Sequence, residues 1–324
     1  MSIVRKLKMA SLAAAVALAA GTAPAAAQSK KVVLSQAFQS MLYLPLYVAI
    51  NKGYFEKEGL DLTKETAGSP TAALSAVISG SAQFSLHGPE WTAIAAEKGA
   101  PVFIMANVVN GAAVWIAAAP DFKYESPKDF KGQKVVTGQM PTTSTSLFIK
   151  LLKENGLGET DVEMIQVPIG SEPGPLAAGQ AKLAVMYEPG LDQVVARGMK
   201  VILGFPKLYG PYAFSSITAR KDVDADLAQR LANGLERAMR FMHANEAETV
   251  EIAKKEFPKL DASVVEAATK RMLADGVYPK SVDITPAALK VGLDTQIALG
   301  NLKAQPDYKT FVGKGFIDKA LTIN

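Results

Sequence analysis

The 324-residue sequence predicts an α/β protein built as two lobes. Short segments rich in β-forming residues alternate with amphipathic helical segments, which is the pattern of parallel βαβ units. The alternation runs through two series, residues 31–112 and residues 113–212, and the rest of the chain is almost wholly helical. A chain that is 49% hydrophobic and 20% charged has enough apolar surface for two packed cores.

The N-terminal segment, residues 1–27, predicts a secretory signal peptide. It carries three basic side chains and no acidic one, then the apolar run 10–20, and it ends on Ala25-Ala26-Ala27. The run is too short for a membrane anchor, which needs roughly 20 apolar residues. Removal leaves 297 residues with 32 basic and 31 acidic side chains. The basic pI therefore gives no support to a nucleic-acid partner, and we expect none.

The chain contains no Cys, which excludes disulfides, Cys-ligated zinc, iron–sulfur clusters, thiol nucleophiles and a lipid-modified N-terminal cysteine. An exported binding protein without a lipid anchor diffuses away unless a second membrane confines it. We therefore expect the mature protein in a bacterial periplasm.

In the first series, strands are expected over 32–37, 60–65, 83–86 and 101–108. The helices between them have clear ends. Ser69-Pro70 begins one helix, with Ser as N-cap and Pro at the first helical position, and Gly80 ends it. Gly88-Pro89 begins the next helix, and Gly99 ends it.

The second series predicts strands over 113–118, 134–137, 162–167, 183–187 and 199–203, with helices starting near Thr142, Glu172 and Pro189. Residues 80–85 resemble residues 179–184, which lie 99 positions later, and in both places a Pro soon begins a helix. This repeat predicts two lobes of like design. The alternative is that the two segments match by chance, because they consist of common small residues.

After a strand over 212–218, helices are expected from near Asp222, over 246–256, over 263–273 and over 286–299. This tail cannot bury its apolar stripes alone, so we expect it to cover the first lobe. The first lobe is then 28–112 with 213–324, the second is 113–212, and two short hinge crossings near residues 112 and 212 join them.

Ligands of open α/β sheets gather where strands end and helices begin. The aromatic, hydroxylic and acidic residues at these junctions are the candidate ligand-binding residues: Phe38, Tyr43, Ser69, Thr71, His87, Glu90, Trp91, Thr142, Thr143, Ser144, Tyr187 and Glu188. The junctions contain no Arg or Lys, which favours a planar, polar, nitrogen-bearing ligand over a strongly anionic one.

Each candidate also has a purely structural interpretation. The Thr142–Ser146 cluster is compatible with a plain helix cap, and His87 with a satisfied histidine behind a buried strand. Carboxylates at helix starts, such as Glu90 and Glu188, are favoured by the helix dipole alone. Trp91 is equally compatible with the core, and Trp115 is expected to pack there.

Catalysis finds little support in the sequence, and we expect a protein that is not an enzyme. The chain has no Gly-x-Ser-x-Gly elbow, no phosphate-binding Gly-x-x-x-x-Gly-Lys and no His-Glu-x-x-His. With only His87 and His243, no histidine-rich metal site is possible, and we expect no catalytic residue, metal or cofactor. Two alternatives stay open: an exported enzyme using His87 with Glu90 or Glu188, and an adaptor that binds another protein.

The chain resembles periplasmic solute-binding proteins of the nitrate, sulfonate, taurine and thiamine-pyrimidine-precursor group. The resemblance covers roughly residues 32–220. The runs that carry it are Tyr43-Leu44-Pro45-Leu46-Tyr47-Val48-Ala49, Lys52-Gly53-Tyr54-Phe55, Gly59-Leu60-Asp61-Leu62, Ser126-Pro127-Lys128-Asp129-Phe130-Lys131-Gly132-Gln133-Lys134-Val135, Ala178-Gly179-Gln180-Ala181 and Tyr187-Glu188-Pro189.

This resemblance implies a type II periplasmic-binding fold. It also implies a substrate-binding component of an ABC importer, which closes on a small molecule and delivers it to a membrane permease driven by an ATPase. We expect the protein to be a monomer. The implied cleft contacts fall on the candidate residues given above, apart from Trp91. One departure concerns Glu172-Pro173-Gly174-Pro175, whose prolines should shorten a helix that is regular in the family and reshape the cleft rim. Relatives that are thiamine pyrimidine synthases use a cysteine-rich motif, which is absent here.

Overall fold

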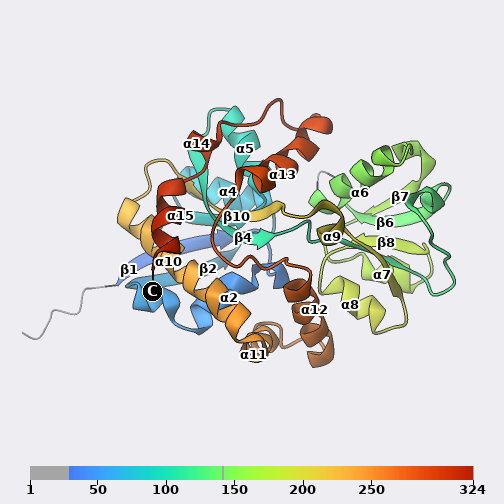
Figure 1. Ribbon diagram of the computed structural model, residues 1–324, viewed down its shortest axis with the longest axis horizontal. Coiled ribbons are helices and arrows are strands. Elements are labelled where there is room, and N and C mark those ends of the chain that lie inside the picture. The colour runs from blue at the N-terminus through green and yellow to red at the C-terminus, as the bar shows by residue number, and fades with distance from the viewer. Residues whose placement is uncertain (1–28, 141, 324) are drawn as a thin grey trace, which may run out of the picture.

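The structure is a computed structural model that describes residues 29–140 and 142–323, and it contains two five-stranded sheets (Figure 1). The predicted signal peptide lies outside the described residues. We call each sheet with the helices packed on it a lobe. Figure 1 shows the two lobes side by side, with the chain crossing between them more than once.

The first sheet has the strand order β2-β1-β3-β10-β4. Its strands are β1 (Lys30–Gln36), β2 (Leu60–Thr66), β3 (Phe84–His87), β4 (Val102–Asn110) and β10 (Ala213–Arg220). β1 pairs in parallel with β2 and β3, whereas β10 runs antiparallel to both β3 and β4. The strand β10 is the segment that returns from the other lobe.

The second sheet repeats this arrangement with the order β7-β6-β8-β5-β9. Its strands are β5 (Trp115–Ala118), β6 (Lys134–Gly138), β7 (Glu163–Val167), β8 (Leu183–Met186) and β9 (Lys200–Gly204). β5 is antiparallel to β8 and β9, and it holds the same fourth position that β10 holds in the first sheet. The sheets are therefore mixed rather than wholly parallel, because each contains one strand supplied by a crossing segment.

Helices cover both sheets, and those from α4 to α10 each follow a strand. In the first series they are α2 (Leu44–Asn51), α3 (Tyr54–Lys57), α4 (Pro70–Ser79) and α5 (Pro89–Glu97), after the 3-10 turn η1 (Met41–Tyr43). The second lobe has α6 (Thr143–Glu154), α7 (Pro173–Ala177), α8 (Gly190–Val195) and α9 (Phe205–Tyr209), with the 3-10 turns η2 (Pro127–Phe130) and η3 (Glu159–Asp161). The five residues of α7 match the expected shortening by prolines.

After β10, the described part of the chain has six helices, α10 (Ala225–Ala244), α11 (Glu246–Glu256), α12 (Ala262–Ala274), α13 (Pro286–Ala298), α14 (Tyr308–Phe311) and α15 (Lys314–Leu321). This tail packs on the first lobe, as expected: α10 contacts α2 and α3, and α13 contacts α5. The apolar stripe of α10 from Leu227 to Met242 is buried against that lobe. The helix α12 also reaches α8 of the second lobe (Figure 1).

The chain passes from the first sheet to the second between Asn110 and Trp115, and it returns between Gly204 and Ala213. Trp115 is 1% exposed and packs in the core, as the sequence predicts. Among the described residues, every helix is too short or too polar to cross a bilayer.

Candidate functional site

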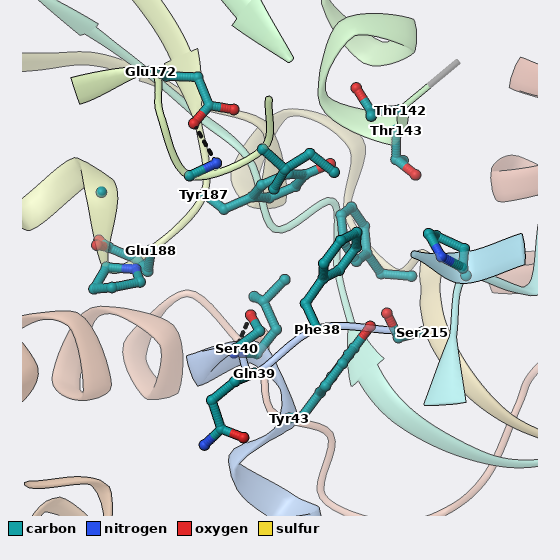
Figure 2. A pocket seen from close by; sticks show the side chains of 18 of the residues that line it. Phe38, Gln39, Ser40, Tyr43, Thr142, Thr143, Glu172, Tyr187, Glu188 and Ser215 are labelled. Atoms are coloured by element: carbon teal, nitrogen blue, oxygen red, sulfur yellow. Dashed lines mark hydrogen bonds between the residues drawn. The ribbon is translucent and has the colours of Figure 1, made fainter. Parts of the chain in front are cut away.

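A pocket of about 450 Å³ lies between the lobes and is lined by both (Figure 2). Strand ends and helix starts converge on it, as the rule for open α/β sheets predicts. Its lining residues are Phe38, Gln39, Ser40, Leu42, Tyr43, Thr66, Pro70, Gly88, Glu90, Trp91, Thr142, Thr143, Ile169, Gly170, Glu172, Tyr187, Glu188, Pro189, Gly190, Gln193, Phe214 and Ser215.

Five aromatic side chains form much of the wall: Phe38, Tyr43, Trp91, Tyr187 and Phe214. In Figure 2, Tyr187 and Phe38 occupy the middle of the pocket, with Glu172 and Thr142 on one side and Gln39 and Tyr43 on the other. Tyr187 of the second lobe lies edge-on to Phe214 of the first lobe, with ring centroids 6.0 Å apart. The Tyr187 hydroxyl accepts a hydrogen bond from the Ser144 N–H at 2.9 Å, which fixes the ring against α6.

Three carboxyl groups line the pocket, and none of the described lining residues is Lys or Arg. Glu90, in the first turn of α5, is 6% exposed, and burial raises its pKa to about 7. Its Oε1 accepts a hydrogen bond of 3.0 Å from the Thr143 hydroxyl. Because Glu90 belongs to the first lobe and Thr143 to the second, this bond joins the lobes beside the pocket.

Glu188 precedes α8, and its side chain is fully buried. Its Oε1 accepts from Arg271 Nε at 2.8 Å, and its Oε2 accepts from the Asp192 N–H at 3.1 Å. Burial and the neighbouring Asp192 carboxyl raise the pKa of Glu188, while Arg271 opposes this rise. Both carboxyl oxygens are therefore already engaged within the protein.

Eight of the twelve candidate residues line the pocket: Phe38, Tyr43, Glu90, Trp91, Thr142, Thr143, Tyr187 and Glu188. Ser69, Thr71, His87 and Ser144 do not. Ser69 caps α4 by accepting from the Ala72 N–H at 3.1 Å, and its hydroxyl lies 3.1 Å from that of Thr71. Ser144 is fully buried behind Tyr187.

His87 is fully buried at the end of β3 and plays a structural part. Its Nδ1 lies 2.9 Å from the Gly88 carbonyl oxygen and its Nε2 lies 2.9 Å from the Ser85 hydroxyl. A carbonyl can only accept, so Nδ1 carries the proton and Nε2 accepts from Ser85. Burial lowers the pKa of His87 to about 4, which keeps the ring neutral at pH 7.

Several lining residues were missed by reasoning from the sequence. Phe214 and Ser215 come from β10, whose place at the pocket depends on the second crossing. Glu172 lies at a predicted strand-to-helix junction, and it is 1% exposed. The others are Gln39, Ser40, Leu42, Thr66, Pro70, Gly88, Ile169, Gly170, Pro189, Gly190 and Gln193. No cluster of three potential metal-ligating His, Cys, Asp or Glu side chains occurs among residues 29–140 and 142–323.

Two similar α/β lobes joined by crossing strands, with a pocket lined from both, define the periplasmic-binding-protein fold. The chain belongs to the family described as NMT1/THI5 like, whose model matches residues 41–249. The resemblance and the fold expected from the sequence are thereby confirmed.

Relatives of known name or structure agree with this assignment. YtlA of Bacillus subtilis (strain 168), a protein named for an inferred binding role, is 23% identical over 252 residues, which are 74% of this chain and 75% of YtlA. The periplasmic aliphatic sulphonate binding protein SsuA from Escherichia coli is 15% identical with a TM-score of 0.72, over 88% of this chain and 91% of SsuA. The desulfurization enzyme DSZB is 11% identical with a TM-score of 0.68, over 90% of this chain and 99% of DSZB. The fold therefore occurs in both binding proteins and enzymes.

Proposed function

We propose that the protein is the substrate-binding component of an ABC-type importer and captures a small, planar, nitrogen-bearing molecule between its lobes. One observation carries this proposal: five aromatic rings and three carboxyl groups line the pocket, and none of the described lining residues is cationic. Aromatic faces stack on planar rings and attract cations, and carboxylates accept hydrogen bonds from N–H groups.

The same pocket is poorly suited to an anion such as a sulfonate. Helix N-termini can hold anions without Arg, but at three of the helix starts around this pocket a protein carboxyl group already stands. Glu90 lies in the first turn of α5, Glu172 is the N-cap of α7, and Glu188 directly precedes the N-cap of α8. An anionic ligand at any of these three helix starts would meet a protein carboxyl group.

Closure of the lobes explains how binding becomes a transport signal. A ligand that contacts both lobes stabilises the shut form over the open form, and a permease can then distinguish loaded from empty protein. Shifting the population from mostly open to mostly shut requires about 5.5 kcal/mol of differential affinity. Stacking on aromatic rings of both lobes together with several hydrogen bonds is of that order. We place this monomeric protein in the periplasm after removal of residues 1–27.

An exported enzyme is the second candidate, because Glu90 is a buried carboxyl group in the pocket whose pKa of about 7 suits a general acid. His87, the catalytic partner that the sequence suggests for Glu90, does not line the pocket. A binding protein returns its ligand unchanged, whereas an enzyme converts it. Mass spectrometry of the ligand after incubation therefore distinguishes the two functions.

A thermal-shift screen tests the proposal. The panel contains pyrimidines, aromatic amines, aromatic carboxylates, sulfonates and nitrate, and mass spectrometry identifies any molecule that copurifies. We expect planar nitrogen compounds to raise the melting temperature, since a ligand that binds only the folded state stabilises it. The Tyr187→Ala variant should lose most of this shift. Stabilisation by sulfonates or nitrate alone, or by no compound, would overturn the proposed ligand class.

A further inference from the structure

The carboxyl group of Glu172, in the pocket, has a hydrogen-bond partner at only one of its two oxygen atoms. Glu172 is 1% exposed, and its Oε2 accepts from the Gly170 N–H at 2.7 Å. Its Oε1 has no hydrogen-bond partner within the described part of the chain. Glu188 has both oxygens engaged, and Glu90 accepts from Thr143. Among the unpartnered buried side-chain atoms of the described residues, Glu172 Oε1 is the one that belongs to a lining residue of this pocket.

Gly138, the last residue of β6, leaves open space between Glu172 Oε1 and two hydroxyl oxygens. A Cβ atom placed on Gly138 would lie 2.9 Å from Thr142 Oγ1, 3.2 Å from Ser144 Oγ and 3.6 Å from Glu172 Oε1. The missing side chain of Gly138 thus lets three oxygen atoms approach one region. Figure 2 shows Glu172 and Thr142 on the same side of the pocket, next to Tyr187.

Such an arrangement is incomplete without a hydrogen-bond donor. A buried polar atom without a partner costs about 1–3 kcal/mol, and more when it is charged. Burial also raises the pKa of Glu172, because a buried carboxylate is poorly solvated. A ligand N–H group would supply the missing donor, and a positive charge on the ligand would strengthen the bond. An oxyanion would instead bring a second acceptor to the same place.

We infer that Glu172 determines ligand specificity by accepting a hydrogen bond from an amine or amidine N–H of the ligand. Thr142, the lining residue nearest to this carboxyl group across Gly138, borders the subsite, and the ring of the ligand lies against Tyr187. The inference rests on the proposed function, because it names the substrate class of the same pocket.

The test compares three probes that share a phenyl ring: benzamidine, benzamide and benzoate. Their head groups are a cationic donor, a neutral donor and acceptor, and an anionic acceptor. In Glu172→Gln, the amide oxygen can keep the bond from Gly170 while an NH₂ donor replaces the free acceptor. The matched control is Glu163→Gln, an exposed carboxyl group on β7 of the same lobe. Isothermal titration calorimetry measures the affinity of each probe for each protein.

We expect the wild-type protein to prefer benzamidine to benzoate by about tenfold or more, which corresponds to about 1.4 kcal/mol. Glu172→Gln should weaken benzamidine binding by at least about tenfold without weakening benzoate, and Glu163→Gln should change neither. Gly138→Ala, whose Cβ would crowd Thr142 Oγ1, should also weaken benzamidine.

Two kinds of failure are distinguishable. If benzamidine binds but Glu172→Gln leaves its affinity unchanged, or if the wild-type protein prefers benzoate, the assignment of Glu172 is wrong while planar-ligand binding stands. If none of the three probes binds and the thermal-shift panel also finds no planar ligand, the proposed function fails and the subsite fails with it.

Discussion

Arg271 Nε lies 2.8 Å from Glu188 Oε1, and the two residues belong to different lobes. A second nitrogen of the same guanidinium group contacts Asp192 Oδ1 at 2.6 Å. Arg271 stands on α12 of the C-terminal tail, whereas Asp192 stands on α8. Because Glu188 also lines the pocket, this ion-pair cluster links the ligand site directly to the contact between the lobes.

Arg271→Met should destabilise the protein by about 1–3 kcal/mol, because it leaves two buried carboxyl groups without their cation. The estimate stays below the cost of breaking a fully buried pair, since the Arg271 side chain is 27% exposed. In Arg271→Met/Glu188→Gln we expect part of this loss to be recovered. Urea unfolding of the two single variants and the double variant gives the coupling energy, and a coupling near zero would contradict the interlobe role.

Tyr187→Ala should weaken ligand binding by about tenfold, because it removes a ring on which a planar ligand stacks. Tyr187→Phe is the matched control: it keeps the ring and loses only the oxygen that accepts from the Ser144 N–H. We expect this control to bind within about threefold of the wild-type protein. Calorimetry with the best compound of the panel checks both values, and equal affinity for all three proteins would place the ligand elsewhere.

His87 should make the protein less stable in acid. Below about pH 6.5 the ring is protonated in the unfolded chain, but in the folded protein it is protonated only near pH 4. The unfolded state thus binds more protons in this window, so stability is lost as the pH falls from 6.5 to 4. The full loss is about 3 kcal/mol for such a shift.

Unfolding by urea at several pH values, for the wild-type protein and His87→Gln, isolates this contribution. As the pH is lowered from 6.5 to 4, the free energy of unfolding of the wild-type protein should fall steadily relative to that of the variant. Parallel pH profiles would show that His87 titrates normally in the folded protein.

Gly234→Ala should destabilise the packing of α10 on the first lobe. An added Cβ would lie 2.6 Å from Phe55 Cδ1, so the clash, typically about 1–3 kcal/mol, should exceed the gain in helix propensity. Gly315, exposed in α15, has no heavy atom within 4 Å of such a Cβ. Gly315→Ala should therefore stabilise the protein by up to about 1 kcal/mol. Thermal unfolding compares the two, and a Gly234→Ala variant as stable as Gly315→Ala would contradict this packing.

Helix caps, turns and strand patterns could be predicted from the sequence, because each depends on residues that are close together in the chain. Ser69 was expected to cap a helix, and its hydroxyl does accept from the Ala72 N–H. The likeness of residues 80–85 to 179–184 indicated lobes of like design, and the sheets share one strand order. The antiparallel positions of β5 and β10 were not predicted, since they depend on which sheet a crossing segment joins.

The site was less accessible to sequence reasoning, because its walls come from distant segments. Phe214 reaches the pocket only through the return crossing, and Arg271 meets Glu188 across 83 positions of the chain. In addition, a residue's place between a strand and a helix does not determine whether its side chain faces the pocket or the core. His87 stands at a junction yet is held by Ser85 and Gly88 away from the pocket wall.

The most direct measurement is a crystal structure of the protein with the panel compound that raises its melting temperature most. We expect ligand density between the lobes, with a planar ring against Tyr187 and an N–H group within hydrogen-bond distance of Glu172. Density for the compound on the outer surface of either lobe, with only solvent in the pocket, would contradict capture between the lobes.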